Sequence, residues 1–385
     1  MGEFDVVIIG AGPAGSVAAH VLAGSGRRVA VADRAVFPRS KLCGGLLTWK
    51  SVRLLETTCG LDLERLRAEK AVHHQSSAYF VYGSGSLVAR GQLPFPFHFS
   101  DRSILDRCLL DVARQSGAQV FEGCRAVDCE PNAGTVICAD GTVLRGKFII
   151  GADGVNSVVR RHMPFFGHMR GMWRSYLAPA MEARIPADRF PRRVIDPELH
   201  VGRIRDGYGW VFPGNDHVLA GICGLRRSNG NFTSLFRDFI RDLGVADPES
   251  VHPGAYPLPY GNYCMNPCHG RAMLAGDAGG FVEPFLGEGI FFAMATGYCA
   301  ARAIADNGDD PVQAAAAYQD MLNRQILPEI RGSDRLRCFL FHSIAAMGTG
   351  WLSLFMRIFG SRLAQTVHGM RSYAWTRAKQ WDFLG

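Results

Sequence analysis

The sequence lacks three features that would assign the protein to an obvious class. It has no long basic run despite a net charge of +7, so we expect an anionic ligand or anionic membrane surface rather than nucleic acid as a partner. The eleven cysteines follow no regular spacing, which argues against a disulfide framework and for reduced thiols in the cytoplasm. Acidic Glu3 and Asp5 precede the first apolar run, so we expect no secretory signal.

A continuous apolar span is also lacking. Residues 339–359 contain only His342 and Arg357 as ionisable groups, but Gly348 and Gly350 divide the stretch, whereas a bilayer span needs about 20 unbroken apolar residues. We therefore expect two short helices, which either cap the interface between domains or dock peripherally on a membrane surface. In the second case the interfacial rings would be Trp351, Trp375 and Trp381.

The first positive signal is a strand that enters a glycine-rich turn and then a helix, at residues 5–16. Gly10 is expected to make the tight turn, and Gly12 to let the backbone approach a pyrophosphate. Gly15 would let the helix and the strand pack closely. The helix N-terminus would present N–H groups and a positive dipole end to the phosphates, beginning at Pro13 and Ala14.

The second strand, residues 28–32, ends at an acidic residue. Asp33 is placed to accept hydrogen bonds from a ribose hydroxyl, and Arg34 stands beside it. Strand, turn, helix and acid together predict a dinucleotide site. On their own they leave FAD and NAD open.

Two later stretches repeat the pattern of a buried strand followed by a polar turn. Residues 148–152 lead into Asp153, which can hold a cofactor ribose or a neighbouring loop. Residues 271–275 lead into Gly276 and Asp277. The long helix that follows would place its positive end toward the ligand of Asp277. The start of this helix is marked by Gly287, Gly289 and Ile290.

The middle of the chain is mostly β. Short candidate strands at 180–185, 200–204, 208–212 and 217–222 predict an antiparallel sheet, which the amphipathic helix 232–243 would cover. The α/β domain is therefore interrupted. The expected segments are 1–70, 98–170 and 262–330 for the nucleotide domain, 71–97 and 171–261 for the β domain, and 331–385 for a helical C-terminal segment.

Two short stretches are candidates for chemistry. Cys43 precedes Gly44 and Gly45, and it is either a buried cysteine in a glycine turn or a residue that faces a substrate or a cofactor. Tyr208 and Trp210 alternate along a strand with Phe212, so the three rings would share one sheet face, as core or as cavity wall. Because Cys264-x-x-x-Cys268-His269 lacks a fourth ligand at useful spacing, we expect no metal.

The three nucleotide signals, in this order, resemble the flavoprotein family built like p-hydroxybenzoate hydroxylase. The resemblance implies a Rossmann-like α/β domain that binds FAD non-covalently, interrupted by a mainly antiparallel β substrate domain. Gly10 to Gly15 would hold the ADP part, and Gly276-Asp277 the pyrophosphate and ribityl chain. Arg102 resembles the arginine that lies over the FAD phosphates in that family.

Three stretches are similar to geranylgeranyl reductases in particular. Lys41 to Gly45 matches their K-x-C-G-G segment, and residues 208–213 match Y-x-W-x-F-P. Residues 276–290 resemble G-D-A-A-G-x-x-x-P-x-x-G-E-G-I, apart from Gly-Gly at 279–280 where Ala-Gly is usual. Further departures are Glu283, where asparagine is usual, and Leu286, where threonine is common.

The resemblance implies an FAD-dependent reductase of isolated C=C bonds in a polyprenyl chain, carried on a lipid, a quinone or a chlorophyll-type precursor. NAD(P)H or ferredoxin would supply electrons, and Lys41, Cys43 and Gly44 would lie at the cofactor. Cys43 to Gly45, Tyr208 and Trp210 would line the reaction cavity. The rival hypotheses are a flavin monooxygenase or halogenase acting on an aromatic substrate, and a non-catalytic flavin-binding redox partner.

Overall fold

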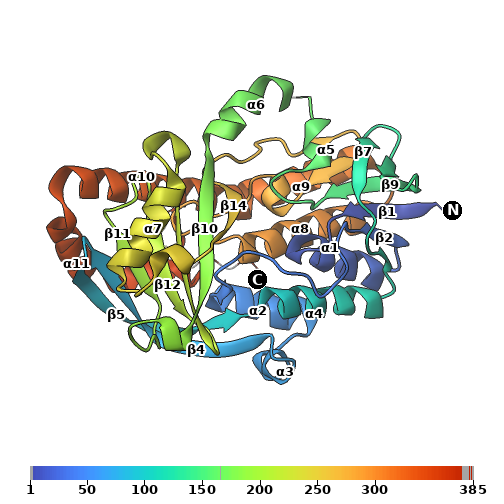
Figure 1. The fold of residues 1–385 in the computed structure, drawn as a ribbon. Helices are drawn as coiled ribbons and strands as arrows, with labels where there is room; N and C mark the ends of the chain where they lie inside the picture. The colour runs from blue at the N-terminus through green and yellow to red at the C-terminus, as the bar shows by residue number, and fades with distance from the viewer. Residues whose placement is uncertain (1–2, 165, 375–380, 382, 384–385) are drawn as a thin grey trace.

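The computed structural model describes residues 3–164, 166–374, 381 and 383. Its strands form two eight-stranded sheets. Figure 1 shows the N-terminal elements at one end of the molecule and the last two helices at the other, with the second sheet between them. This architecture confirms the expected α/β fold, with a parallel-sheet domain, a mainly antiparallel second sheet and a helical C-terminal segment.

The first sheet carries the strands that lead into the nucleotide signals. Its strands are β1 (Phe4–Ile9), β2 (Val29–Ala32), β6 (Gln119–Phe121), β7 (Ala126–Glu130), β8 (Thr135–Cys138), β9 (Val143–Gly151), β15 (Cys268–His269) and β16 (Ala272–Leu274). The order is β15-β16-β9-β1-β2-β6, and β1, β2, β6, β9 and β16 pair in parallel. The parallel pairing brings the carboxyl ends of these strands to one edge, where ligands of open α/β sheets bind.

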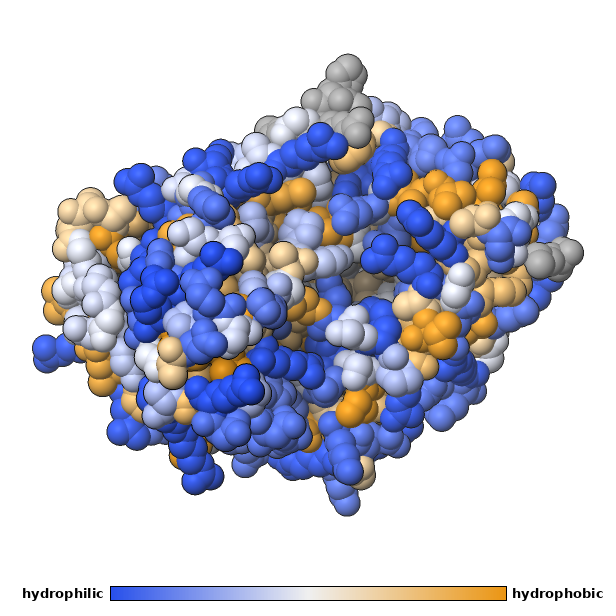
Figure 2. Space-filling view, in the orientation of Figure 1, coloured by the Kyte–Doolittle hydropathy of each residue, from blue (hydrophilic) through white to orange (hydrophobic). Residues whose placement is uncertain are grey.

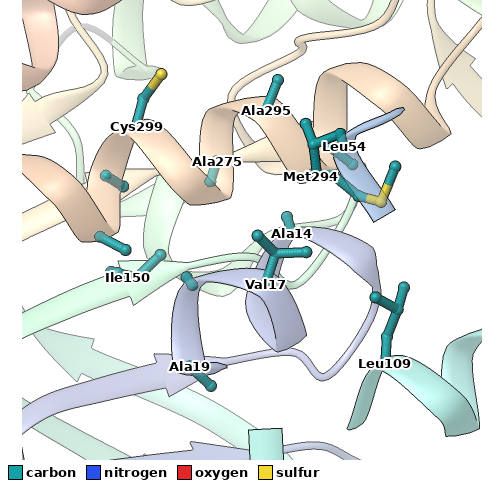
Figure 3. Packing of buried hydrophobic residues seen from close by; sticks show 14 of the residues in the cluster. Ala14, Val17, Ala19, Leu54, Leu109, Ile150, Ala275, Met294, Ala295 and Cys299 are labelled. Atoms are coloured by element: carbon teal, nitrogen blue, oxygen red, sulfur yellow. The ribbon is translucent and has the colours of Figure 1, made fainter. Parts of the chain in front are cut away.

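Helices cover the first sheet and form the largest core cluster. The α-helices of the described residues are α1 (Pro13–Gly24), α2 (Trp49–Cys59), α3 (Leu63–Ala68), α4 (Arg102–Gln115), α5 (Val158–Arg161), α6 (Phe166–Ser175), α7 (Phe232–Asp242), α8 (Ile290–Asp306), α9 (Pro311–Met321), α10 (Leu327–Met347) and α11 (Thr349–Val367). Shorter helical turns include the 3-10 turn η4 (Gly276–Ala278) and the π-helical turn η5 (Leu322–Ile326). Figure 3 shows Ala14 and Val17 of α1 against Met294 of α8. The backbones of α1 and α8 lie in close contact, because a Cβ atom on Gly297 of α8 would lie 2.1 Å from the Ala14 carbonyl oxygen.

The second sheet is antiparallel apart from one pair. Its strands are β3 (Leu46–Leu47), β4 (Val72–Gly83), β5 (Ser86–Ser100), β10 (Leu177–Pro186), β11 (Glu198–Val201), β12 (Gly207–Pro213), β13 (His217–Gly224) and β14 (Gly254–Pro259). The order is β14-β10-β13-β12-β11-β4-β5-β3, and β11 runs parallel to β4. β3 belongs to this sheet although residues 46–47 fall in the segment expected for the nucleotide domain, and β5 continues past the expected boundary at 97.

The two faces of the second sheet have different covers, as strand alternation requires. Gly209 and Val211 of β12 face α7, where a Cβ atom on Gly209 would lie 2.8 Å from the Phe239 ring. Tyr208 and Trp210 face the other way and cluster with side chains of α10 and α11. The residues 208–212 therefore place aromatic rings between the sheet and the C-terminal helices.

The C-terminal region contains two helices that pack on the second sheet. They are separated at Gly348, which has a φ of +74° and ends α10. In the described part of the chain, no helix is long and apolar enough to span a membrane. The expectation of an interfacial ring is wrong for Trp381, whose Nε1 donates to the Gln325 carbonyl and whose ring stacks on Phe292. Trp375 lies outside the described residues.

The buried His368 makes acid stability a test of this packing. Its ring stacks on Phe97, its Nδ1 accepts from the Trp49 amide, and burial lowers its pKa from 6.5 to about 3. Between pH 6.5 and pH 3, His368 is therefore protonated in the unfolded state and neutral in the folded state. Stability is retained above pH 6.5 and falls by up to about 1.4 kcal/mol per pH unit between pH 6.5 and 3 from this group.

We expect His368→Asn to flatten this acid-side slope in denaturant titrations of the FAD-saturated protein between pH 7 and pH 4. The matched control is His342→Asn, because His342 is an exposed histidine of α10. The control should keep the slope of the wild type. Parallel curves for His368→Asn and the wild type would contradict the assignment.

Candidate active site

The carboxyl end of β1 forms an open turn at the start of α1. Gly10 has a φ of +99° and lies against the Ala152 backbone, while a Cβ on Gly15 would lie 1.8 Å from the Gly10 carbonyl oxygen. Gly12 is different, because a Cβ placed there would meet only the Arg39 Nη2 atom, at 3.6 Å. No side chain caps the α1 N-terminus, so its N–H groups and a guanidinium face this open space.

The acid at the end of β2 is already engaged by backbone. Asp33 Oδ2 accepts from the Ala11 amide at 2.7 Å, and its Oδ1 accepts from the Ala35 amide at 2.8 Å. The carboxylate therefore braces the glycine turn, and each of its oxygens keeps lone pairs for a further donor such as a ribose hydroxyl. The neighbouring Arg34 is exposed.

A pair of arginines shares one buried carboxylate beside the turn. Arg102 donates to both oxygens of Asp106, at 2.9 and 3.0 Å, and Arg39 Nη2 donates to Oδ2 at 2.9 Å. Burial disfavours the charge of Arg102, but the Asp106 carboxylate and the Cys43 side chain together outweigh this and raise the pKa of Arg102. The trio carries one net positive charge, which suits a pyrophosphate. Arg39 and Asp106 belong to no spacing pattern and were missed by sequence reasoning.

Two aspartates lie at the ends of β9 and β16. Asp153 Oδ2 accepts from the Val158 amide at 2.6 Å, and its buried Oδ1 has no hydrogen-bond partner among the described residues. Burial raises the pKa of both Asp153 and Asp277. Nearby cations partly offset this rise at Asp277, and they are Lys41, Arg102 and Arg160. The orphaned oxygen, the open glycine turn and the cations form a donor set that fits an anionic dinucleotide.

The expected chemical residues meet at one cavity of about 250 Å³. Two glycine segments form one side of the cavity: the first is residues 43–45 and the second is residues 287–289. The lining residues that the sequence analysis predicted on this side are Cys43, Gly44, Gly45, Gly287, Gly289 and Ile290. Gly44 has no room for a side chain, because a Cβ would lie 2.7 Å from the Phe212 ring. Lys41 lies just outside, with Nζ 3.2 Å from the Tyr256 ring centroid, and burial lowers its pKa.

Aromatic rings and the C-terminal helices form the other walls. The ring centroids of Tyr208 and Trp210 are 5.9 Å apart, and those of Trp210 and Phe212 are 6.4 Å apart. The Tyr208 hydroxyl donates to the Leu286 carbonyl, which ties the aromatic strand to the second glycine segment. From α10 and α11 come Leu340, Phe341, Ile344, Leu352 and Leu363. The functional interpretation of Tyr208 and Trp210 as cavity residues therefore has a geometric basis.

Three carboxyl groups line the cavity, and sequence reasoning assigned a role to none of them. Burial raises the pKa of Glu182 and that of Glu283 to about 7 each. Glu283 accepts from the Phe285 and Leu286 amides and from the Ser333 hydroxyl. Glu288 forms a 2.6 Å ion pair with Lys50. Glu182 is in none of the motifs, so nothing in the local sequence could have indicated it.

The cysteines considered for a metal lie apart from this cavity. Cys264 is buried, and its amide donates to the Gly279 carbonyl, whereas Cys268 lies in β15. Within the described ranges, neither belongs to a group of three or more His, Cys, Asp or Glu side chains close enough to share an ion.

Comparison with known proteins gives consistent matches over most of the chain. The family model for the FAD binding domain matches residues 3–204. Menaquinone reductase of Mycobacterium tuberculosis is 32% identical over 77% of this chain and 76% of its own. The chloroplastic geranylgeranyl diphosphate reductase of Oryza sativa subsp. japonica is 28% identical over 89% of this chain and 76% of its own.

A solved structure shows the same fold. It is a geranylgeranyl bacteriochlorophyll reductase-like protein of Thermoplasma acidophilum, with a TM-score of 0.74 and 18% identity over 95% of this chain and 91% of that chain. The FAD-domain match covers more than half of the sequence. The chain therefore belongs to the FAD binding domain family and is an FAD-dependent oxidoreductase, whose relatives include proteins named menaquinone reductase and geranylgeranyl diphosphate reductase.

Proposed function

We propose that the protein reduces isolated C=C bonds of a polyprenyl chain attached to an uncharged, lipid-soluble carrier, with a prenylated quinone as the favoured class. The observation that carries this proposal is the apolar cavity that adjoins the glycine segments 43–45 and 287–289. Bound FAD supplies hydride transfer. The protein's own contribution is to hold the chain, exclude water and supply a proton.

The cavity suits a chain rather than a compact ring. Ser333 of α10 bonds Glu283 beside the second glycine segment, and Ile344 lies on the same helix about 16 Å further along. Leu340, Phe341 and Ile344 all line the cavity, so its wall follows this helix away from the glycine segments. A hydrocarbon chain in such a space gains about 0.8 kcal/mol for each buried methylene.

The charges around the cavity favour a neutral head group. Among the described residues that line it, none is Lys, Arg or His, whereas Glu182, Glu283 and Glu288 are present. A diphosphate buried there would face carboxyl groups and would find no cation in the cavity wall to compensate its own charge. Its burial would therefore carry a large desolvation cost. A quinone ring carries no such charge, and the similarity to menaquinone reductase points the same way.

The test compares two substrates with the same prenyl chain, one with a quinone head and one with a diphosphate head. The protein is reduced chemically under anaerobic conditions, which makes the identity of the natural electron donor irrelevant. Because the quinone ring can itself accept electrons, the readout is saturation of the chain, measured by mass spectrometry. We expect saturation of the quinone-linked chain. Saturation of the diphosphate alone would overturn the head-group assignment, and no saturation of either would overturn the function.

We also propose that the outer face of α10 and α11 contacts an anionic membrane surface, from which the substrate enters. Met347, Leu354 and Ile358 are exposed by 55%, 56% and 61%. Arg357 and Arg362 are exposed on the same face of α11 as Leu354 and Ile358, which is the pattern of an interfacial helix. Figure 2 shows hydrophobic side chains interrupting the hydrophilic surface at the end of the molecule where these helices lie.

Replacing apolar residues of this face by glutamate should reduce membrane binding. We expect the triple variant Met347→Glu, Leu354→Glu, Ile358→Glu to lower flotation with anionic phosphatidylglycerol vesicles at least 10-fold, because it removes apolar contact and adds repulsion. The control is Val312→Glu, at an α9 residue that is 75% exposed. Equal flotation of the triple variant and the wild type would remove this surface from the proposal.

A further inference from the structure

Glu182 occupies the junction between the first glycine segment and the aromatic strand. It lies within β10, and only 4% of it is exposed. Its Oε2 accepts from the Trp210 indole Nε1 at 3.1 Å, and a Cβ on Gly44 would lie 3.9 Å from the same oxygen. The carboxyl group therefore lines the cavity next to the residues expected at the cofactor and at the substrate.

The surroundings of Glu182 leave its charge weakly compensated. Arg184, on the same strand, has a side chain that is 59% exposed and lies 3.8 Å from Asp101. The cations on the loop and helix beside the cavity have other partners: Lys41 lies over the Tyr256 ring, and Arg102 binds Asp106. Burial raises the pKa of Glu182 to about 7, while the Trp210 indole and the Cys43 amide partly offset the rise. A proton is therefore both held and released near neutral pH.

The other two cavity carboxyls are committed to structural partners. Glu283 accepts hydrogen bonds from two backbone amides and from the Ser333 hydroxyl, and these bonds fix the turn before the second glycine segment. Glu288 is paired with Lys50 and accepts from the Thr48 hydroxyl at 2.7 Å. Among the described residues, Glu182 forms no ion pair such as the one between Glu288 and Lys50. It also accepts no pair of backbone amides from a turn, as Glu283 does.

We propose that Glu182 is the proton donor of the alkene reduction, an inference that rests on the proposed function. In this step the π bond breaks and two C–H bonds form. One carbon receives a hydride from the reduced FAD, which is thereby oxidised by two electrons, and the other carbon receives the proton of the Glu182 carboxyl. The indole N–H of Trp210 stabilises the carboxylate that remains, and water returns the proton before the next turnover.

The test uses the FAD-loaded full chain and the variants Glu182→Gln, Glu182→Asp and Glu198→Gln. Glu198 is the matched control, because it is a glutamate of the same sheet, in β11, that is 6% exposed and pairs with Arg192 outside the cavity. We expect Glu182→Gln to keep its FAD and its chemical reduction but to saturate the prenyl chain about 100-fold more slowly or worse. Glu182→Asp should recover part of the rate, and Glu198→Gln should match the wild type.

A second readout does not depend on turnover. Burial raises the pKa of both Glu182 and Glu283 to about 7, so infrared difference spectra of the oxidised protein between pH 6 and pH 8 should show two titrating protonated carboxyl bands. Both bands should persist in Glu198→Gln, whereas Glu182→Gln should lose one band and keep the band of Glu283. If the wild type saturates the chain and Glu182→Gln does so equally fast with the same pH profile, this inference fails and the proposed function stands. If Cys43→Ala abolishes the pH dependence of the saturation rate while Glu182→Gln keeps that dependence, the inference also fails. If the wild type saturates no prenyl chain, both fail together.

Discussion

Replacing Gly12 by alanine is expected to weaken FAD binding at least 100-fold while leaving the fold of the apoprotein intact. A Cβ at this position meets only the Arg39 guanidinium, at an ordinary contact distance of 3.6 Å, so the folded chain accommodates it. A pyrophosphate on the N–H groups of α1 would occupy the same space, and the methyl group would hold it away. Isothermal titration of the apoprotein with FAD measures the loss directly.

The control for this prediction is Gly24→Ala, at the other end of α1, where a Cβ meets nothing within 4 Å. We expect this control to bind FAD as the wild type does. For Gly12→Ala, the free energy of unfolding of the apoprotein should fall by no more than about 1 kcal/mol, the cost of placing alanine instead of glycine at the N-cap of α1. Unchanged FAD affinity in Gly12→Ala would contradict the placement of the phosphates at this helix.

Filling the end of the cavity at Ile344 should change which prenyl chains are accepted. Ile344 lines the cavity about 16 Å along α10 from Ser333, far from the glycine segments. Ile344→Trp would occupy the space of roughly one isoprene unit. Excluding about four methylene-sized groups costs about 3 kcal/mol, so KM for a long-chain substrate should rise roughly 100-fold. A short-chain substrate with the same head group should keep its KM and kcat.

The matched control is Phe339→Trp, because Phe339 lies on the same helix with 54% exposure and points away from the cavity. It should leave KM unchanged for both chain lengths. Flavin content and thermal unfolding of both variants exclude a general loss of structure. An equal rise of KM for short and long chains in Ile344→Trp would show that the prenyl chain does not extend along α10.

The parts of the site that sequence reasoning predicted are those that one continuous stretch encodes. The turn at Gly10 to Gly15 needs only the local order of strand, glycine and helix. The shared face of Tyr208 and Trp210 follows from strand alternation, which the structure bears out. The break between α10 and α11 follows from Gly348, whose positive φ ends the helix.

The parts that could not be predicted depend on contacts between distant segments. Glu182 acquires its place only because β10 lies behind the loop at Gly44, more than a hundred residues earlier in the chain. Arg39 and Arg102 can both hydrogen-bond to Asp106 only because the loop after β2 folds over α4. A carboxyl or a guanidinium in an irregular segment has no periodicity, so its partner is decided by tertiary packing alone.

The most direct test of the account is a single anaerobic turnover. The FAD of the purified protein is reduced chemically, a polyprenyl quinone with an unsaturated chain is added without O₂, and the flavin absorbance is followed. The mass of the product is measured after any quinol has been oxidised back to the quinone, so that only hydrogen gained by the chain is counted. We predict that the flavin is reoxidised and that each reacted chain gains two hydrogen atoms at one C=C bond. A flavin that stays reduced until O₂ is admitted, followed by a product that has gained oxygen or halogen, would contradict the account and identify a monooxygenase or a halogenase.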